Sequence, residues 1–349
     1  MTPKNLPCAL ALAFLNVAAA APALATPSGP LPLIATMSNT VDNQLLIYSA
    51  DGVLVKSMST QGQGAVSGNS GGVAAVGNRI AVVNFASATV TVFVRGPGPS
   101  AYAVEELIAT SGGPVSVAFG SGHLYILTTT QVESHALGRG GVDTHADGAA
   151  NLLHADGSAA QVGVLEEQLI VTEKSNVIET FALSHSGAVA GAATLVADIP
   201  QNVNAPFGLV TRENQAYVTI AHADEISLVR RNAVITVTGS VSQHAPCWVA
   251  LDGPYLYSTN SPSHSVSRYL VHGKAIVQEV AVAATFIGAP TDIAYGAGVL
   301  AVVDSAAGLS RVSTFNVDED GNLTSRASVT LGGSGTNGVA VLPSGDLDR

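Results

Sequence analysis

The chain has 349 residues, of which 47% are hydrophobic and only 11% are charged, and its formal net charge is −11. Its 14 Lys and Arg residues form no basic cluster. This argues against binding to nucleic acid or to an anionic membrane, because both need concentrated positive charge.

The first 25 residues have the pattern of a secretory signal. Lys4 provides a positive start, residues 6–20 are almost wholly apolar, and the small residues 23–25 resemble a cleavage site. An asparagine and a proline interrupt the apolar run, which disfavours a transmembrane anchor. We therefore expect a signal peptide over residues 1–25, a single domain over residues 26–349, and a secreted or periplasmic protein.

Cleavage of that signal would leave Cys247 as the only cysteine. Internal disulfides could then contribute nothing to stability, so a large apolar core must replace them. Cys247 lies beside Trp248 in an apolar run, which predicts a buried and unreactive thiol.

Short apolar runs recur every 40 to 47 residues along the chain. Their centres are Val73, Val117, Val162, Leu209, Val249, Ile293 and Val339. Each run begins a group of alternating or apolar segments separated by Gly, Asn, Asp and Ser, a pattern typical of β-strands joined by turns. A period of this length is typical of four-stranded propeller blades.

The first predicted strands show how the blades are laid out along the chain. Three strands without an inner strand come first, and a complete group of four follows. These seven strands cover residues 33–36, 44–48, 53–58, 72–76, 79–84, 89–94 and 102–109. The same order recurs in five further repeats as far as residue 331, and residues 138–150 are predicted to be a mobile Gly- and Ala-rich loop.

The last predicted strand, residues 338–342, has no strand after it to pair with. Joined to the three N-terminal strands, it would complete a blade and close a ring. Two half-rings or an open solenoid remain alternatives, but the orphan strand favours closure, which removes unpaired edges. The sequence therefore predicts an all-β, seven-bladed propeller in which the C-terminal strand completes the first blade.

This arrangement also predicts where a site would lie. In each blade the start of the inner strand and the end of the second strand share one face of the ring. Polar residues occupy these positions in most blades, namely Asn39, Asn84, Thr128, Gln161, Glu173, Asn260, Asp292 and Asp304. The structural alternative is that they cap strand ends and hydrogen-bond to turns.

Glu173 is the most informative of these residues, because a carboxylate near a channel axis must be solvated, paired or used. Pairing with Lys174 or with another blade is its structural alternative. His222 and His244 are expected on the same face, while Trp248 either plugs the channel or forms an apolar wall for a ligand.

Two short glycine motifs carry less weight. Residues 68–72 match G-x-S-x-G, and residues 333–338 match the dinucleotide-binding fingerprint. A strand rather than a helix follows each of them, so we interpret both as turns.

The chain resembles the lactonase-like seven-bladed propellers, a group that includes phosphogluconolactonase-like proteins and fungal 3-carboxymuconate cyclases. The segments that carry the resemblance are residues 113–118, 169–176, 205–208, 245–249 and 289–292. The resemblance implies that Glu173 matches the family's glutamate at the end of a second strand. The family's histidine, expected just before Ser116, is Val115 here, and no arginine is evident at the strand ends. A lactonising enzyme acting on polyanions needs a cationic pocket, whereas this face looks neutral to acidic.

Two functional hypotheses follow from these residues. In the first, an exported lactonase or cycloisomerase acts on a small uncharged lactone, with Glu173 as the general base and His244 or His222 as a secondary acid. The residues expected to contact the ligand are Asn84, Thr128, Gln161, Phe207, Trp248, Asn260, Asp292 and Asp304. No cofactor is predicted, although a divalent cation held by Glu173, Asp304 and the Asn side chains is a variant of this hypothesis.

In the second hypothesis the propeller is not catalytic and binds a protein or a saccharide on the same polar face. The absent histidine and arginines favour the second hypothesis, while Glu173 favours the first, and the fold does not decide between them. In either case we expect a monomer.

Overall fold

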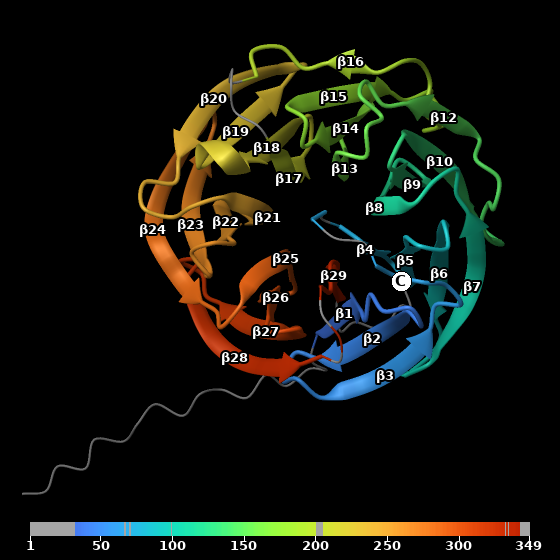
Figure 1. The fold of residues 1–349 in the computed structure, drawn as a ribbon, viewed down its shortest axis with the longest axis horizontal. Coiled ribbons are helices and arrows are strands. Elements are labelled where there is room, and N and C mark those ends of the chain that lie inside the picture. Colours follow the sequence, from blue (N-terminus) through green and yellow to red (C-terminus); the bar gives the residue numbers. More distant parts are fainter. Residues whose placement is uncertain are drawn as a thin grey trace, which may run out of the picture.

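The computed structural model describes residues 32–65, 68–69, 71–98, 100–199, 205–331, 333 and 335–342. The predicted signal peptide lies outside the described residues. The strands form seven small antiparallel sheets around a central axis (Figure 1). The predicted seven-bladed propeller is therefore confirmed.

Within each blade the strands run from the axis to the rim in chain order, and blade one alone takes its inner strand from the C-terminus. Blade one contains β29 (Val339–Leu342), β1 (Leu33–Met37), β2 (Gln44–Ser49) and β3 (Leu54–Ser59). Blade two contains β4 (Val73–Val76), β5 (Arg79–Asn84), β6 (Thr89–Arg95) and β7 (Tyr102–Ala109). Blade three contains β8 (Pro114–Gly120), β9 (His123–Thr128), β10 (Gln131–Gly138), β11 (Gly141–Val142) and β12 (Gly148–Asn151).

The remaining blades each have four strands. Blade four contains β13 (Ala159–Val164), β14 (Gln168–Glu173), β15 (Val177–Ala182) and β16 (Thr194–Leu195). Blade five contains β17 (Pro206–Arg212), β18 (Gln215–Ile220), β19 (Glu225–Arg230) and β20 (Ala233–Gly239). Blade six contains β21 (Pro246–Asp252), β22 (Tyr255–Asn260), β23 (Ser265–His272) and β24 (Ala275–Thr285), and blade seven contains β25 (Ala289–Gly296), β26 (Val299–Ala306), β27 (Leu309–Val317) and β28 (Leu323–Thr330).

The core lies between neighbouring blades. Second strands such as β9 and β14 are almost fully buried, because a blade covers each of their faces, and they read as continuous apolar runs. Outer strands such as β28 alternate between exposed and half-buried positions. The largest fully buried side chains include Tyr125, Tyr217, Tyr257 and Tyr269. Elsewhere the abundant Ala and Val side chains allow the sheets to pack closely.

The two ends of the chain meet in blade one. β29 pairs antiparallel with β1, from Leu33 opposite Leu342 to Thr36 opposite Val339. The Thr36 hydroxyl also donates a hydrogen bond to the Gly338 carbonyl at 2.7 Å. The predicted closure of the ring by the C-terminal strand is therefore confirmed.

The predicted loop over residues 138–150 is wrong, because this segment contains β11 and β12, both paired with β10. Its small residues serve close packing rather than mobility. A Cβ atom at Gly148 would collide with the Val189 carbonyl oxygen of blade four.

The described residues contain one helical element, the short 3₁₀ turn η1 (Ala221–Ala223). No helix in this part of the chain has the length and apolar character needed to cross a membrane.

Candidate functional site

We call the face of the ring that carries the ends of the second strands the Glu173 face. The polar residues predicted at these strand ends are Asn84, Thr128, Glu173, Asn260 and Asp304, and none is more than 1% exposed. Asn84, Glu173 and Asp304 also contact the preceding blade or the connection that leads from it. These three side chains are therefore buried at junctions between blades rather than grouped around an open mouth.

Asn84 illustrates such a junction. Its side-chain oxygen accepts hydrogen bonds from Asn43 Nδ2 at 2.9 Å and Thr60 Oγ1 at 2.6 Å, both in the region of blade one. Its amide nitrogen donates to Thr91 Oγ1 at 2.9 Å within blade two. This set of partners leaves Asn84 little capacity to orient a substrate.

Asn260 and Thr128 make local contacts. Asn260 donates to Ser265 Oγ and Ser267 Oγ on the next strand, at 3.1 and 2.9 Å. Thr128 Oγ1 accepts a hydrogen bond from the Gln131 backbone N–H at 3.1 Å. Both side chains therefore stabilise the hairpin that follows their strand.

Asp304 makes a nearly buried ion pair that the sequence analysis missed. Arg311 Nη2 lies 3.0 Å from Asp304 Oδ2, which also accepts the Gly288 backbone N–H at 2.8 Å. Arg311 lies directly opposite Asp304 in the β26–β27 register. The signal was available in the sequence, because a hairpin of this length places the two residues side by side.

Replacing Arg311 with Leu is expected to lower the free energy of unfolding by about 3–5 kcal/mol, because it leaves the Asp304 carboxylate buried without its cation. Chemical denaturation at pH 7 measures the loss. The double variant Arg311→Leu, Asp304→Asn should recover part of it. A loss below about 1 kcal/mol for the single variant, the range of exposed pairs, would contradict a buried-pair role.

Glu173 lies at the junction between blades three and four and has no exposed surface. Its Oε1 accepts the His154 backbone N–H at 3.1 Å, whereas Oε2 has no hydrogen-bond partner among the described residues. Burial raises the pKa of Glu173 above its ordinary value. The connection from β12 to β13 covers the carboxyl group and separates it from solvent.

A second buried carboxyl group, Glu179, accompanies it and was not predicted. Its Oε2 accepts the Leu153 backbone N–H at 3.0 Å, and its Oε1 has no described partner. Burial, with a smaller contribution from the negative charge of Glu173, raises the pKa of Glu179 to about 8. No motif in the sequence pointed to this pair, because Glu179 lies in the middle of a mostly apolar third strand.

The channel end on the Glu173 face is covered by the segment we call the cap, described at residues 68, 69, 71 and 72. Figure 1 shows the chain that leads into β4 reaching toward the axis. Trp248 Nε1 donates to the Asn69 carbonyl at 3.0 Å, and Lys174 Nζ donates to the Gly68 carbonyl at 2.9 Å. The Gly71 backbone N–H donates to Asp292 Oδ2 at 3.2 Å.

These contacts tie the cap to blades four, six and seven. The last glycine of the matched G-x-S-x-G motif is required by this packing, since a Cβ at Gly72 would collide with the Asn337 carbonyl oxygen. Trp248 is only 5% exposed, and its indole packs against the cap. Of the two predicted roles for Trp248, this contact favours the plug.

Around Trp248 lie two other residues considered in the sequence analysis. Phe207 contacts the indole edge-on, with ring centroids 5.3 Å apart, and Lys174 Nζ lies 5.7 Å from the Phe207 centroid. Cys247 is a free, buried cysteine, as predicted, and its thiol donates to the Ala245 carbonyl at 3.1 Å. Burial raises the pKa of that thiol.

The axial channel itself lies beneath the cap and has a volume of about 320 Å³. Its walls are the inner strands, including the repeat anchors Val73, Val117 and Val162. Gln161 and Asp292 line its capped end, where Gln161 Oε1 accepts the Leu209 backbone N–H at 2.6 Å. These two predicted ligand residues are thus together, but on the inner side of the cap.

The two predicted secondary acids lie on the exposed surface of the Glu173 face. His244 Nδ1 contacts Asp224 Oδ2 at 2.9 Å, and the histidine side chain is 71% exposed. Asp224 Oδ1 also accepts the Ala245 backbone N–H at 2.6 Å. His222 is exposed on η1. Both histidines are therefore in water, whereas Glu173 is sealed in a different junction.

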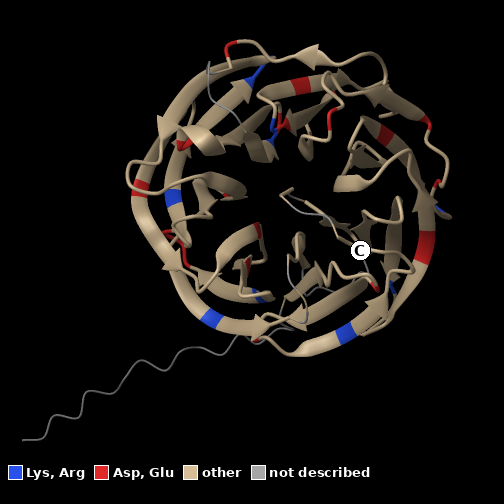
Figure 2. Ribbon diagram, in the orientation of Figure 1, with Lys and Arg blue, Asp and Glu red and all other residues tan. Residues whose placement is uncertain are grey.

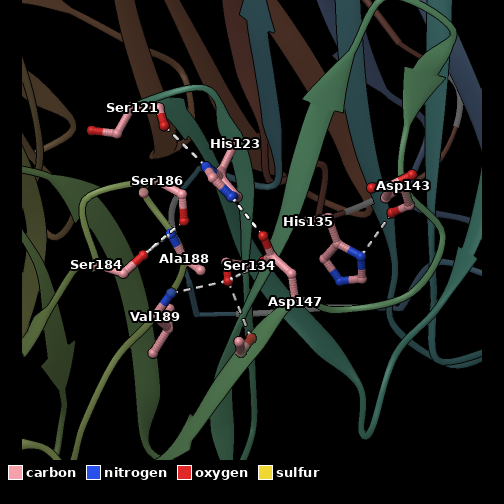
Figure 3. A network of polar contacts seen from close by, with 12 residues as sticks. Ser121, His123, Ser134, His135, Asp143, Asp147, Ser184, Ser186, Ala188 and Val189 are labelled. Atoms are coloured by element: carbon pink, nitrogen blue, oxygen red, sulfur yellow. Dashed lines mark hydrogen bonds and ion pairs between the residues drawn. The ribbon is translucent and has the colours of Figure 1, made fainter.

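A separate polar network crosses blade three (Figure 3) and includes a serine, a histidine and an aspartate. The Ser134 hydroxyl contacts Asp147 Oδ1 at 2.7 Å, and His123 Nε2 contacts Asp147 Oδ2 at 2.9 Å. The carboxylate thus lies between the serine and the histidine, whereas a nucleophilic serine needs the histidine as its direct partner. Since Ser134 also accepts the Val189 backbone N–H at 3.0 Å, this network braces blade three against blade four.

His135 lies in the same blade and is buried beside Glu133, with His135 Nε2 3.5 Å from Glu133 Oε2. Burial opposes ionisation of this carboxyl group, but contacts from His135, Ser111 and Gln131 outweigh it and lower the pKa of Glu133 to about 2. Blade three is therefore braced by an ionised carboxylate, in contrast to Glu179 in blade four, whose pKa is raised to about 8.

Charge is distributed without a focus. Figure 2 shows the few described Lys and Arg residues scattered around the ring. No group of three or more His, Cys, Asp or Glu that could hold a metal ion occurs in the described part of the chain. Glu173 and Asp304 lie in different junctions, three blades apart, so these two side chains cannot bind the same cation.

The comparisons with known proteins concern the fold. No family model and no curated protein matches the chain. A solved structure named as a functionally unknown protein from Desulfotomaculum acetoxidans is 10% identical, with a TM-score of 0.69 over 89% of this chain and 99% of the other. A "putative 6-phosphogluconolactonase" from Bacteroides uniformis is 13% identical, with a TM-score of 0.69 over 90% of this chain and 100% of the other. A similarly named protein from Bacteroides fragilis is 13% identical, with a TM-score of 0.65 over 92% and 100%. The architecture of the chain and these neighbours together identify its fold as a seven-bladed propeller.

Proposed function

We propose that this chain is an exported, non-catalytic propeller that binds a protein partner on its Glu173 face. The observation that carries the proposal is a contrast in exposure on that face. Glu173, the one residue matched to a catalytic role, has no exposed surface, while two aliphatic side chains at loop tips are largely exposed, Val241 by 89% and Ile287 by 75%.

Val241 and Ile287 lie in the successive connections that enter blades six and seven. Val241 has a φ of 25°, which is unfavourable for a β-branched residue. Aliphatic groups that are costly to expose become favourable contacts when a partner covers them.

A groove beside Ile287 supports the same assignment. It has a volume of about 370 Å³ and is lined by Phe286, Phe315 and Leu323 together with Arg311. An apolar side chain of a partner could enter this groove while the surrounding polar groups contact its rim, which is the usual anatomy of a protein interface. Export is part of the proposal, supported by the pattern of residues 1–25.

Hydrolysis of an uncharged lactone is the second candidate. Two observations favour it, namely the solved structures named as a "putative 6-phosphogluconolactonase" and the raised pKa of Glu173, which is typical of a general base. It would require the connection over Glu173 to open. A saccharide is a further candidate for the exposed polar groups of this face.

In the binding test the mature chain is immobilised on a resin. The resin is then incubated with the extracellular or periplasmic fraction of the source cells to capture a partner. We expect the double variant Val241→Asp, Ile287→Asp to capture at least tenfold less partner protein than the wild type, as measured by quantitative mass spectrometry. Val277→Asp, on the exposed outer strand β24, is the matched control and should retain it. Equal capture by both variants would contradict a partner at this surface.

The catalytic test compares the wild type with Glu173→Gln on δ-gluconolactone and γ-butyrolactone. We expect no hydrolysis above background for either protein and unchanged folding of the variant. Lactone turnover that disappears in Glu173→Gln would replace the binding function by the hydrolytic one. Glycan binding without protein capture would instead favour the saccharide.

A further inference from the structure

The axial channel opens on the face opposite to Glu173. Several inner strands are buried where they begin, at the capped end, and half-exposed where they end. β8 shows this clearly, since Pro114 to Val117 are buried and Ala118 to Gly120 are partly exposed. β17 and β21 follow the same gradient. The channel is therefore a blind pocket with one entrance.

The pocket is apolar along its wall and polar at its closed end. The wall consists of aliphatic anchors of the repeat, including Val117, Val162 and Ile293, with Ala74 and Phe119 nearer the entrance. A volume of about 320 Å³ falls within the range of small-molecule sites. Such a wall favours a ligand with a compact hydrocarbon body.

The charge of the lining residues indicates which ligands the pocket disfavours. No Lys or Arg lines the pocket, and Asp292 is the only ionisable lining residue that the structure describes. Its two oxygens accept the backbone N–H groups of Ile293 and Gly71 at 2.8 and 3.2 Å. An anionic ligand would lie close to this carboxylate and to no Lys or Arg among the described lining residues, so the pocket disfavours carboxylates and phosphates.

Gln161 supplies a specific donor at the closed end. Its Oε1 is fixed by the Leu209 N–H at 2.6 Å, which leaves Nε2 as the free end of the amide. No described residue accepts a hydrogen bond from this nitrogen. A ligand carbonyl or ether oxygen could accept it.

We propose that the axial channel binds a small, neutral, largely apolar molecule that enters from the face opposite to Glu173 and places a carbonyl-type oxygen at Gln161. This site is separate from the proposed partner surface, because the cap and Trp248 lie between them. Either assignment can therefore fail without the other.

The test measures binding of three related probes to the intact mature chain by ligand-observed NMR titration. 1-Tetralone carries a carbonyl acceptor, tetralin lacks it, and 1-naphthoate adds a negative charge. We expect saturable one-to-one binding of 1-tetralone, binding of tetralin weaker by about two- to tenfold because one hydrogen bond is lost, and no saturable binding of 1-naphthoate.

Two variants locate the site. Ala74→Phe adds a large ring to the channel wall and should abolish 1-tetralone binding, whereas Val277→Phe, on an exposed outer strand, should not change it. Gln161→Glu keeps an acceptor for the Leu209 N–H and removes the amide donor, so it should weaken 1-tetralone binding to the level of tetralin. Thermal melts confirm that each variant is folded.

Several results would overturn the proposal. They are the absence of saturable 1-tetralone binding to the wild type, equal affinity for all three probes, and unchanged affinity in a folded Ala74→Phe variant. If Ala74→Phe does not fold, unchanged affinity in Gln161→Glu overturns the placement of the ligand oxygen.

Discussion

Deleting residues 338–349 is expected to abolish cooperative folding of the propeller. The deletion removes β29, the inner strand of blade one, and with it the closure of the ring. Val339, Ala340 and Leu342 are buried against neighbouring blades. Burying aliphatic side chains contributes about 1.5–3 kcal/mol each, so the loss approaches the roughly 5–15 kcal/mol that stabilises a typical domain.

Two control variants distinguish the effect of losing β29 from the effect of losing residues 343–349. Deletion of residues 343–349 alone should leave the thermal transition unchanged. A permuted chain that carries residues 336–342 and a Gly-Asn turn directly before Leu33 should fold again, because Leu342 lies opposite Leu33 in the sheet. Far-UV circular dichroism and calorimetry measure all three. A cooperative transition within a few degrees of the wild type in the 338–349 deletion would show that closure is dispensable.

Replacing Glu179 with Gln is expected to stabilise the protein at alkaline pH. The pKa of Glu179 is raised to about 8 in the folded chain, whereas an unfolded glutamate titrates near 4.3. Between these values the folded state keeps a proton that the unfolded state has lost. Stability therefore falls as the pH rises through this window, by up to about 1.4 kcal/mol per pH unit.

The Gln variant removes this titration and keeps an acceptor for the Leu153 N–H. Its free energy of unfolding should exceed that of the wild type by several kcal/mol at pH 8.5 and by much less at pH 5. Urea denaturation at the two pH values measures the difference. Glu167→Gln, at an exposed position of the same blade, should show no such gain. A parallel pH dependence of wild type and Glu179→Gln would contradict a proton held at this site.

The candidate site was less predictable than the fold, for a physical reason. Asn84, Glu173 and Asp304 were correctly placed at the ends of second strands, because strand direction follows from the repeat. Whether a strand end faces solvent depends on how the next connection crosses it. The connection over Glu173, and the cap that meets Trp248, are contacts between residues far apart in the chain.

The same limit explains what the sequence analysis missed. Asp224 and His244 lie in different blades and meet only because consecutive connections pass over the same face. Residues 138–150 were predicted to be a loop because Gly and Ala are common in turns, yet in blade three they provide the small side chains that two additional strands need. Local composition could not distinguish these two uses.

The sequence by itself determined the number of blades, most strand bounds and the closure by the C-terminal strand, because a repeated apolar pattern has one efficient way to bury its strands. Only the tertiary structure decided which polar residues are reachable. In the folded chain the channel is covered on the Glu173 face and open on the other. The reason is that burial depends on segments that pack in from other blades, and the local sequence does not predict where those segments run.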